Sequence, residues 1–293
     1  MQVGFFAVGL GPYVDPTLVR TVAVTAERLG FSTIWAPEHV VLLEQYGSKY
    51  PYSAGEFPFP LDTPLGDPFT TLAYAAACTT RIRLGSGICL VPEHHPLVLA
   101  KTVATVDRLS GGRFILGAGV GWLAEEFKAL GIPFERRGHR TREYIEVMRK
   151  VWTEPRSSYR GEFVEFEGVV SYPKPAGNKA VPVWFGGEST AALRRVATYG
   201  DGWLGFNLMP DQTAERIRQI EALLRANGRK RSDIHLAVSP YASPITGDDL
   251  KRYLDAGADE VVLLALDMPS TEQGVIEKLE LMAREFVEPG ARL

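Results

Sequence analysis

Short apolar runs alternate along the chain with longer stretches in which apolar residues recur every three or four positions. The clearest case lies between residues 82 and 118. Residues 82–90 form an apolar, β-branched run without polar alternation, which predicts a strand covered on both faces, as in a parallel sheet. Residues 96–109 follow the helical period, and residues 113–118 predict a second buried strand. Together they predict a right-handed βαβ unit.

The same alternation recurs over the whole chain. Strands are expected at residues 3–8, 32–36, 82–90, 113–118, 181–185, 202–206, 234–238 and 260–265. Helices are expected at residues 16–29, 67–80, 96–109, 140–152, 189–199, 211–226, 248–256 and 271–286, with a shorter one at 122–130. This order predicts an α/β fold, a (β/α)8 TIM barrel forming a single domain over residues 1–293, and the length exceeds the roughly 250 residues that a barrel needs. An open, doubly wound sheet is the structural alternative, because alternation alone does not establish closure.

Two insertions interrupt the alternation, one after the second strand and one after the fourth. Residues 42–66 are rich in Pro, Gly and aromatic residues and show no period, and a segment of this length in a compact domain suggests a lid. Residues 153–180 contain the pieces FVEFEG and VVSYPKPAG, which predict a small hairpin and a Pro-bounded connection. The aromatic residues of the first insertion favour an apolar or aromatic substrate: Tyr46, Tyr50, Tyr52, Phe57 and Phe59.

The net charge and the cysteine content indicate which kinds of partner and environment to expect. The formal net charge is −3, with no basic stripe, so nucleic acid and anionic membranes are not expected as partners and a small organic molecule is. Cys78 and Cys89 are the only cysteines, and both are expected to be packed thiols. The first residues, MQVGFFAVGL, lack a basic leader and are too short an apolar run to span a bilayer, so we expect a cytoplasmic protein.

Small residues gather where predicted strands end. Gly117, Gly119 and Gly121 alternate at the end of the fourth strand, where bare backbone would let a planar ligand lie close, although a tight turn explains them equally well. GAGVG lacks the spacing and the later acidic residue of a Rossmann fingerprint.

A second group of small residues joins the fifth strand to its helix. Gly186 and Gly187 lie in the turn, and Ser189 and Thr190 begin the helix. Free backbone N–H groups, hydroxyls and the helix dipole favour a negative group there, so a phosphate would fit. An ordinary helix cap with turn-forming glycines is the alternative.

His39 is the most suggestive titratable residue. It follows the second predicted strand directly after Glu38, and imidazole exchanges protons near neutral pH. A loop histidine bonded to backbone is the alternative. Glu93-His94-His95 resembles a metal cluster, but neighbouring side chains diverge and the first strand carries no ligand, so no metal is expected.

One long run carries a family resemblance. The residues of the pattern AKxxATxDxxSxGRxxLGxGxG, between Ala100 and Gly121, make the chain resemble the bacterial luciferase-like superfamily of flavin- and deazaflavin-dependent oxidoreductases. WFGGEST followed by YGDGW resembles the phosphate loop of that superfamily, which supports Gly186, Gly187, Ser189 and Thr190 as cofactor contacts. The likeness covers nearly the whole chain and implies a luciferase-like barrel.

The resemblance implies further roles. Related enzymes have a non-proline cis peptide behind the cofactor ring, expected here at Gly87-Ile88 within the segment Gly85-Ser86-Gly87-Ile88. Glu38-His39-Val40 resembles the strand-two segment of the deazaflavin enzymes, so His39 is expected to handle a proton and Glu38 to orient it. Trp122 stands where the related sugar-phosphate dehydrogenases have a glutamate, so that activity is not expected. Trp122 offers an apolar wall instead, and Glu125 or Glu126 is a weaker candidate for the missing acid.

The run GWLAEEFKALGIPFERRGHRTRE resembles the F420-dependent members of the superfamily. The implied reaction is hydride transfer between C5 of coenzyme F420 and a small organic substrate beneath the lid. A two-component monooxygenase that takes reduced FMN from a separate reductase and uses oxygen is the first alternative. A non-catalytic flavin-binding barrel is the second. The resemblance also implies a homodimer formed through the helices at 68–79 and 97–109.

Overall fold

Eight parallel strands close into a barrel in the computed structural model, which describes residues 1–6, 8–53, 55–265, 267 and 269–293. The strands are β1 (Gln2–Phe6), β2 (Thr33–Ala36), β3 (Arg83–Ser86), β5 (Phe114–Gly119), β8 (Val183–Gly186), β9 (Gly202–Phe206), β10 (His235–Ser239) and β11 (Glu260–Leu264). β1 pairs with β2 and β11, and β3 pairs with β5, so the ring has no open edge between them. The fold is therefore the predicted (β/α)8 barrel, and the open-sheet alternative is wrong.

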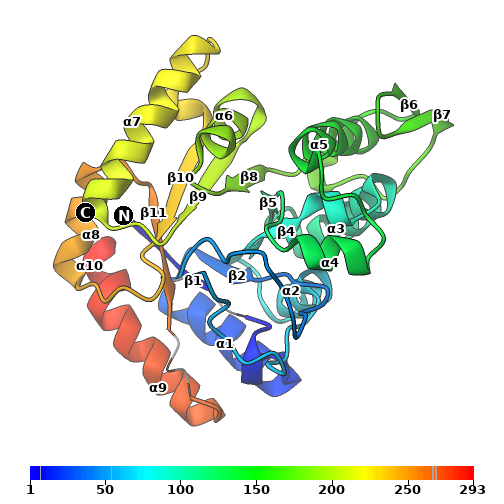
Figure 1. The fold of residues 1–293 in the computed structure, drawn as a ribbon. Coiled ribbons are helices and arrows are strands. Elements are labelled where there is room, and N and C mark those ends of the chain that lie inside the picture. The colour runs from blue at the N-terminus through cyan, green and yellow to red at the C-terminus, as the bar shows by residue number, and fades with distance from the viewer. Residues whose placement is uncertain (7, 54, 266, 268) are drawn as a thin grey trace.

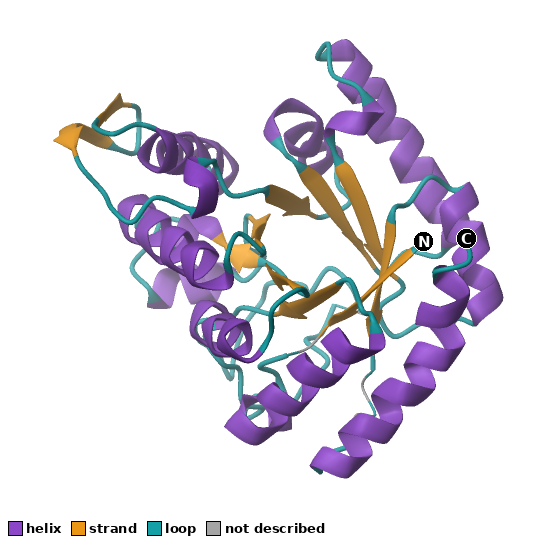
Figure 2. Ribbon diagram, turned by 180° about the vertical axis from the view of Figure 1, so that it is seen from behind, coloured by secondary structure: helices purple, strands orange, loops and turns teal. Residues whose placement is uncertain are grey.

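Helices surround the strands, as Figures 1 and 2 show from opposite sides. They are α1 (Pro16–Leu29), α2 (Pro68–Cys78), α3 (Pro96–Ser110), α4 (Ala124–Ala129), α5 (Arg137–Thr153), α6 (Thr190–Tyr199), α7 (Pro210–Ala226), α8 (Gly247–Asp255), α9 (Glu272–Met282) and α10 (Glu288–Gly290). Short 3-10 turns lie at η1 (Gly11–Val14), η2 (Val91–Glu93), η3 (Ala176–Asn178) and η4 (Arg231–Asp233). Among the described helices, none combines the length and apolar character needed to cross a membrane.

Several boundaries differ from the prediction, most of them by one to three residues. The third strand, expected over 82–90, is broken after Ser86 by a cis peptide between Gly87 and Ile88, and β4 (Cys89–Leu90) resumes the pairing with β5. The last helix, expected over 271–286, changes to a π-helical turn (Ala283–Val287). The first strand, expected over 3–8, ends at Phe6, and residue 7 lies outside the described residues.

Large side chains fill the inside of the barrel. Trp35 and Trp184 meet there with ring centroids 5.5 Å apart, and Ile115, Leu204 and Val262 pack around them. The outer core lies between the strands and the helices. Burial of this apolar surface is the main favourable term in the stability of the fold.

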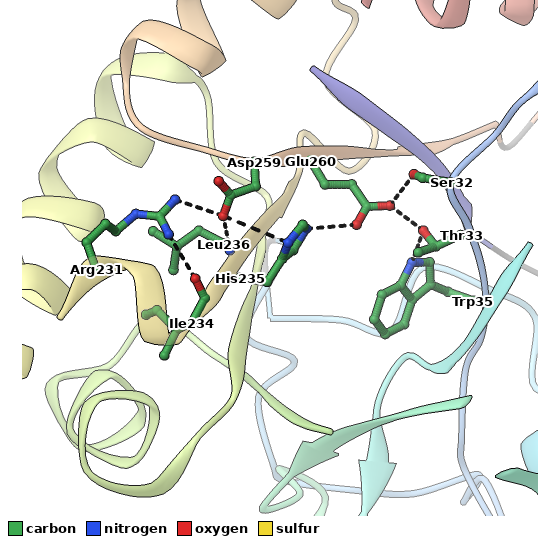
Figure 3. Close-up of polar contacts among 9 residues, drawn as sticks. All are labelled: Ser32, Thr33, Trp35, Arg231, Ile234, His235, Leu236, Asp259 and Glu260. Carbon is green, nitrogen blue, oxygen red and sulfur yellow. Dashed lines mark hydrogen bonds and ion pairs between the residues drawn. The ribbon is translucent and has the colours of Figure 1, made fainter. Parts of the chain in front are cut away.

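A polar network closes the amino-terminal end of the barrel (Figure 3). The fully buried carboxylate of Glu260 accepts hydrogen bonds from the hydroxyls of Ser32 (2.6 Å) and Thr33 (2.5 Å), and its other oxygen lies 3.2 Å from Nε2 of His235. The His235 ring stacks on Trp184 with centroids 4.6 Å apart. Because every polar atom of Glu260 has a partner, its burial is compatible with a stable fold.

Both insertions differ from the regular barrel, as predicted. β6 (Ser157–Arg160) and β7 (Glu165–Val169) form the expected antiparallel hairpin, which projects away from the barrel in Figure 1. The buried carboxylate of Glu143 on α5 accepts from the backbone N–H groups of residues 162–164 and ties the hairpin down. The segment 42–66 contains no helix or strand among its described residues and runs over the carboxyl-terminal ends of the strands.

Candidate functional site

A cavity of about 340 Å³ lies at the carboxyl-terminal ends of the strands, beneath the segment 42–66. This is the end of a (β/α)8 barrel at which active sites are built. Its walls are mostly apolar. The lining includes Phe6, Leu10, Leu204, Phe206 and Leu264 from the barrel, and Tyr50, Tyr52, Phe57, Phe59 and Leu65 from the covering segment.

Most of the predicted cofactor residues reach this cavity. Those on its wall are Gly87, Ile88, Gly119, Gly121, Trp122, Gly186, Gly187 and Ser189, together with Glu38 and His39. Gly85, Ser86, Gly117 and Thr190 do not line it. Gly85 abuts the ring of Trp35, and a Cβ on Gly117 would lie 1.9 Å from the carbonyl oxygen of Ser86, so the chain's own packing requires these two glycines.

The side chain of Ile88 explains why two further positions on the cavity wall are glycine. A Cβ on Gly119 would lie 2.5 Å from Cδ1 of Ile88, and a Cβ on Gly186 would lie 2.6 Å from the same atom. The Ile88 side chain therefore occupies the space between the ends of β5 and β8. Its position follows the cis peptide that the resemblance implied, and it forms part of the cavity wall.

Glu126, and not Glu38, holds His39. Oε2 of Glu126 lies 2.8 Å from Nδ1 of His39, and Oε1 accepts from the backbone N–H groups of Val40 (2.7 Å) and Val41 (3.1 Å). Nε2 of His39 lies 3.4 Å from the indole N–H of Trp122. Since indole only donates, Nε2 is the unprotonated nitrogen and Nδ1–H donates to Glu126. Nε2 is thus left able to take a proton beside the cavity.

The expectation that Glu38 orients His39 is wrong, because neighbouring residues at the end of a strand point to opposite sides. Oε2 of Glu38 accepts from the backbone N–H of Leu90 (2.5 Å), and Oε1 lies 3.0 Å from Nε2 of His94. Burial lowers the pKa of His94, but the hydrogen bond and charge of Glu38, with Asp67, raise that pKa overall. Glu38 and His94 therefore form a second carboxylate–imidazole pair.

Cys89 stands beside this second pair, and the fold brings its thiol, Glu38 and His94 within 4.8 Å of one another. Burial, followed by the charge and hydrogen bond of Glu38, raises the pKa of the Cys89 thiol well above its usual value. The thiolate that a metal requires is disfavoured, and both oxygens of Glu38 already have partners.

Glu93, in η2, is close enough to both pairs to feel the charges of Glu126 and Glu38. It is 8% exposed, and both of its carboxyl oxygens are buried without a hydrogen-bond partner among the described residues. Burial, together with the charges of Glu126 and Glu38, raises the pKa of Glu93 to about 9. Glu93 is therefore a neutral acid at neutral pH. The sequence analysis considered Glu93 only as part of the run Glu93-His94-His95, because nothing local distinguishes its own environment from that of a solvated glutamate.

Two arginines lie near one another at the edge of the cavity. Arg195 of α6 lines the cavity, and its Nε is buried without a partner among the described atoms. Arg137, at the start of α5, donates from Nε to the carbonyl oxygen of Gly121 (3.1 Å). Burial and the neighbouring charge of Arg195 lower the pKa of Arg137. Within the described residues neither guanidinium has a carboxylate partner, so this rim is suited to an anion.

Ser189 serves as the cap of α6 at the same place. Its Oγ accepts from the backbone N–H of Ala192 (3.2 Å), and its hydroxyl proton remains able to donate. The cap that we weighed as the alternative is therefore present, and Ser189 lines the cavity together with Arg195. Arg195 stands six residues after Ser189, a spacing that the sequence analysis did not use.

The segment 42–66 covers His39 with aromatic rings. Phe57 meets His39 with ring centroids 5.5 Å apart, and Tyr50 meets Trp122 at 5.3 Å. The hydroxyl of Tyr52 is hydrogen-bonded to Glu188, whose carboxylate also accepts from the backbone N–H of Phe206 (2.7 Å). We call residues 42–66 the lid, because they separate His39 from solvent on this side.

A parallel barrel with a mostly apolar cavity at its carboxyl-terminal end, lined by a histidine and an arginine, is typical of proteins that bind a small molecule. The chain belongs to the luciferase-like monooxygenase family, whose model matches residues 1–272. Members of this family are oxidoreductases. The predicted superfamily is thereby confirmed.

Two proteins of related sequence and one solved structure illustrate what the chain is similar to. An uncharacterized protein of Mycobacterium tuberculosis is 35% identical over 240 residues, which cover 81% of this chain and 83% of that protein. An F420-dependent glucose-6-phosphate dehydrogenase of Intrasporangium calvum is 29% identical over 72% of this chain and 60% of its own length. The coenzyme F420-dependent tetrahydromethanopterin reductase of Methanopyrus kandleri has the same fold, with a TM-score of 0.76, 20% identity, and coverage of 98% of this chain and 99% of its own.

Proposed function

We propose that this protein is an F420-dependent oxidoreductase that transfers a hydride between the deazaflavin and a small organic substrate, with His39 handling the accompanying proton. The observation that carries the proposal is the state of His39. Glu126 holds Nδ1–H and Trp122 donates to Nε2, so the ring of His39 is fixed at the cavity wall, where it would exchange a proton. The bound coenzyme would supply hydride chemistry at C5, and the protein supplies orientation and exclusion of water.

The residues present fit a cofactor with an anionic tail. Arg137 and Arg195 offer two guanidinium groups without carboxylate partners, and Gly186, Gly187 and Ser189 add backbone and hydroxyl donors at the start of α6. These groups would hold a phosphate. The wall around Ile88 and Gly119 would support the ring.

Two features support F420 over FMN. The run from Gly121 through Glu143 resembles F420-dependent enzymes, and the relative from Intrasporangium calvum is named for that coenzyme. The family description favours the alternative, a two-component monooxygenase that receives reduced FMN from a separate reductase. The aromatic cavity wall supports an apolar or aromatic substrate, and Trp122 on that wall argues against a sugar phosphate.

The test is a paired fluorescence titration of the apo-protein with F420 and with FMN, followed by measurement of oxygen consumption after reduction. Tighter binding of F420 without stoichiometric oxygen uptake is the expected result. Preference for FMN with oxygen uptake would establish the monooxygenase instead. Tight binding with no turnover of any screened substrate, unchanged in His39→Ala, would indicate a non-catalytic flavin-binding barrel.

We also propose that the protein is a cytoplasmic homodimer joined through α2 and α3. Tyr74 on α2 and Val98 and Leu109 on α3 are exposed large apolar side chains, at 42%, 64% and 67%. Such side chains lose contact with water when a second copy covers them. Analytical ultracentrifugation at micromolar concentration should show a dimer, and Val98→Glu should weaken it. A wild-type monomer would refute this interface.

A further inference from the structure

We propose that Glu125, together with Ser48, is a positioning residue for His39: it binds the start of the lid to α4 and thereby keeps Glu126 in place beside the imidazole. The inference rests on the proposed function in one respect, since it takes His39 to be the group that handles the proton. It adds two residues that the proposed function does not use, and it makes the orientation of His39 depend on the lid.

Two consecutive glutamates of α4 bind the chain at both ends of residues 40–48, which we call the lid arm. Oε1 of Glu126 accepts hydrogen bonds from the backbone N–H groups of residues 40–41, at 2.7 and 3.1 Å. Oε1 of Glu125 accepts hydrogen bonds from the backbone N–H groups of residues 47–48, at 2.6 and 3.3 Å. The lid arm is therefore attached at both of its ends to one turn of one helix.

The lid arm also supplies the cap that α4 lacks. The backbone N–H of Ala124, the first residue of α4, donates to Oγ of Ser48 (3.0 Å). Leu123, at the N-cap position, has no side-chain acceptor to offer. The first N–H groups of a helix need partners, and a helix of only six residues has little stability of its own. The first turn of α4 therefore depends on a hydroxyl group from the lid arm.

The same turn carries the carboxylate that orients His39. Oε2 of Glu126 lies 2.8 Å from Nδ1 of His39, and Glu126 directly follows Glu125. Inward packing of Leu123 (2% exposed) and Phe127 (0% exposed) holds the helix on the barrel, but these side chains give the N–H groups no partner. Release of the lid arm would therefore loosen the first turn, and Glu126 with it, while the rest of the helix stays in place.

The lid arm also supports the aromatic cover over His39. The hydroxyl of Tyr46 accepts from the backbone N–H of Phe57 (3.2 Å), and the Phe57 ring lies 5.5 Å from that of His39 between centroids. The ring of Tyr46 meets that of Trp122 at 6.0 Å. A lid arm bound to α4 thus brings the cover and the orienting carboxylate to His39 together.

The test measures hydrogen exchange by NMR in 15N-labelled apo-protein, at the Nδ1–H of His39 and at the backbone amides of residues 40–41. Among the described contacts all three groups donate to Glu126 and none donates to Glu125. Glu125→Ala should speed their exchange at least fivefold, the factor expected when a helix loses its cap. Glu125→Gln keeps an oxygen that can accept from Gly47 and should restore most of the protection. The backbone amides carry the test if the ring proton exchanges too fast to be seen.

Glu27→Ala is the matched control. Glu27 of α1 also accepts from backbone N–H groups, those of residues 80–82, but it does so just before β3, at the end of the barrel opposite the cavity. This variant should lower stability in urea and leave the three exchange rates unchanged. If Glu125→Ala does not fold by circular dichroism, Ser48→Ala takes its place, and Ser48→Thr is then the variant that keeps the hydroxyl.

The proposal is overturned if His39 and residues 40–41 exchange at the wild-type rate in Glu125→Ala and in Ser48→Ala, because Glu126 would then be held without the lid arm. An equal increase in Glu27→Ala would overturn it as well, since general destabilisation would explain the result. These measurements need neither coenzyme nor substrate. A failure of both F420 and FMN to bind would therefore refute the proposed function separately.

Discussion

Three buried glutamates lie near His39 and His94, and they differ in their hydrogen bonds. Glu126 and Glu38 each accept from backbone N–H and contact a histidine. Glu93 has no donor among the described residues, so burial and the two neighbouring charges favour its acid form and raise its pKa to about 9.

This difference predicts a pH-dependent stability. In the unfolded chain Glu93 loses its proton above about pH 4.3, whereas the folded protein keeps it up to about pH 9. Between those values unfolding releases a proton, so this residue makes stability fall by about 1.4 kcal/mol per pH unit as pH rises. Urea denaturation at pH 6, 7 and 8 should show this slope in wild type and its loss in Glu93→Gln. Equal slopes in the two proteins would contradict the assigned charge state.

Among the elements, the lid is attached to the barrel partly through a carboxyl group that titrates near neutral pH. Tyr52 is hydrogen-bonded to Glu188, and Nδ2 of Asn207 donates to the carbonyl oxygen of Tyr52 (3.0 Å). Burial raises the pKa of Glu188 to about 7. Aromatic packing, with Tyr52 and Phe206 at 4.9 Å, and further hydrogen bonds, such as that from the backbone N–H of Gly47 to Oε1 of Glu125 (2.6 Å), complete the attachment.

Lid opening should therefore increase with pH. When the lid opens, Glu188 meets water and its pKa returns toward the ordinary value, so an open lid releases a proton that the closed lid holds between about pH 4.3 and 7. Amide hydrogen exchange in residues 42–66, corrected for intrinsic rates, should show an opening constant about threefold to tenfold larger at pH 8 than at pH 5.5. Glu188→Gln should abolish this pH dependence. A dependence that persists in the variant would assign it to another group.

The elements could be predicted well because buried parallel strands and amphipathic helices leave strong periods in the sequence. The positions of side chains within the site could not, since they depend on contacts between distant segments. Glu38 was assigned to His39 on chain proximity, and the alternation of side chains at a strand end places it elsewhere. Glu126 did leave a signal. It shares the helical spacing of Leu123, Phe127 and Leu130, so it stands on the inward face of α4.

For the whole molecule, the network around Glu260 joins β2, β10 and β11 at the amino-terminal end of the barrel (Figure 3). Beside this network, the guanidinium of Arg83 lies 4.9 Å from the ring centroid of Trp184. Burial lowers the pKa of Arg83, while the charge of Glu260 acts in the opposite direction. Removing the carboxylate therefore leaves the hydroxyl protons of Ser32 and Thr33 and Nε2 of His235 without this hydrogen-bond partner.

Glu260→Ala should destabilise the protein by about 3–5 kcal/mol, the usual cost of removing one partner from a buried charged network. Urea denaturation monitored by tryptophan fluorescence measures this change. The matched control is Glu280→Ala, which breaks an ion pair with Arg28 in which the side chains are 35% and 54% exposed, and it should cost about 1 kcal/mol or less. Similar losses in both variants would show that the Glu260 network is no more important than a surface pair.

The closed amino-terminal end of the barrel has a consequence for the order in which molecules bind. Since the Glu260 network and the tryptophans above it block the amino-terminal end, whatever binds near Ile88 enters from the lid side, and a molecule bound above it stands in its way out. The molecule near Ile88 must then bind first and leave last. Initial-rate studies with product inhibitors should accordingly give the patterns of a compulsory-order scheme, in which the product of the outer molecule departs before the inner one can be exchanged.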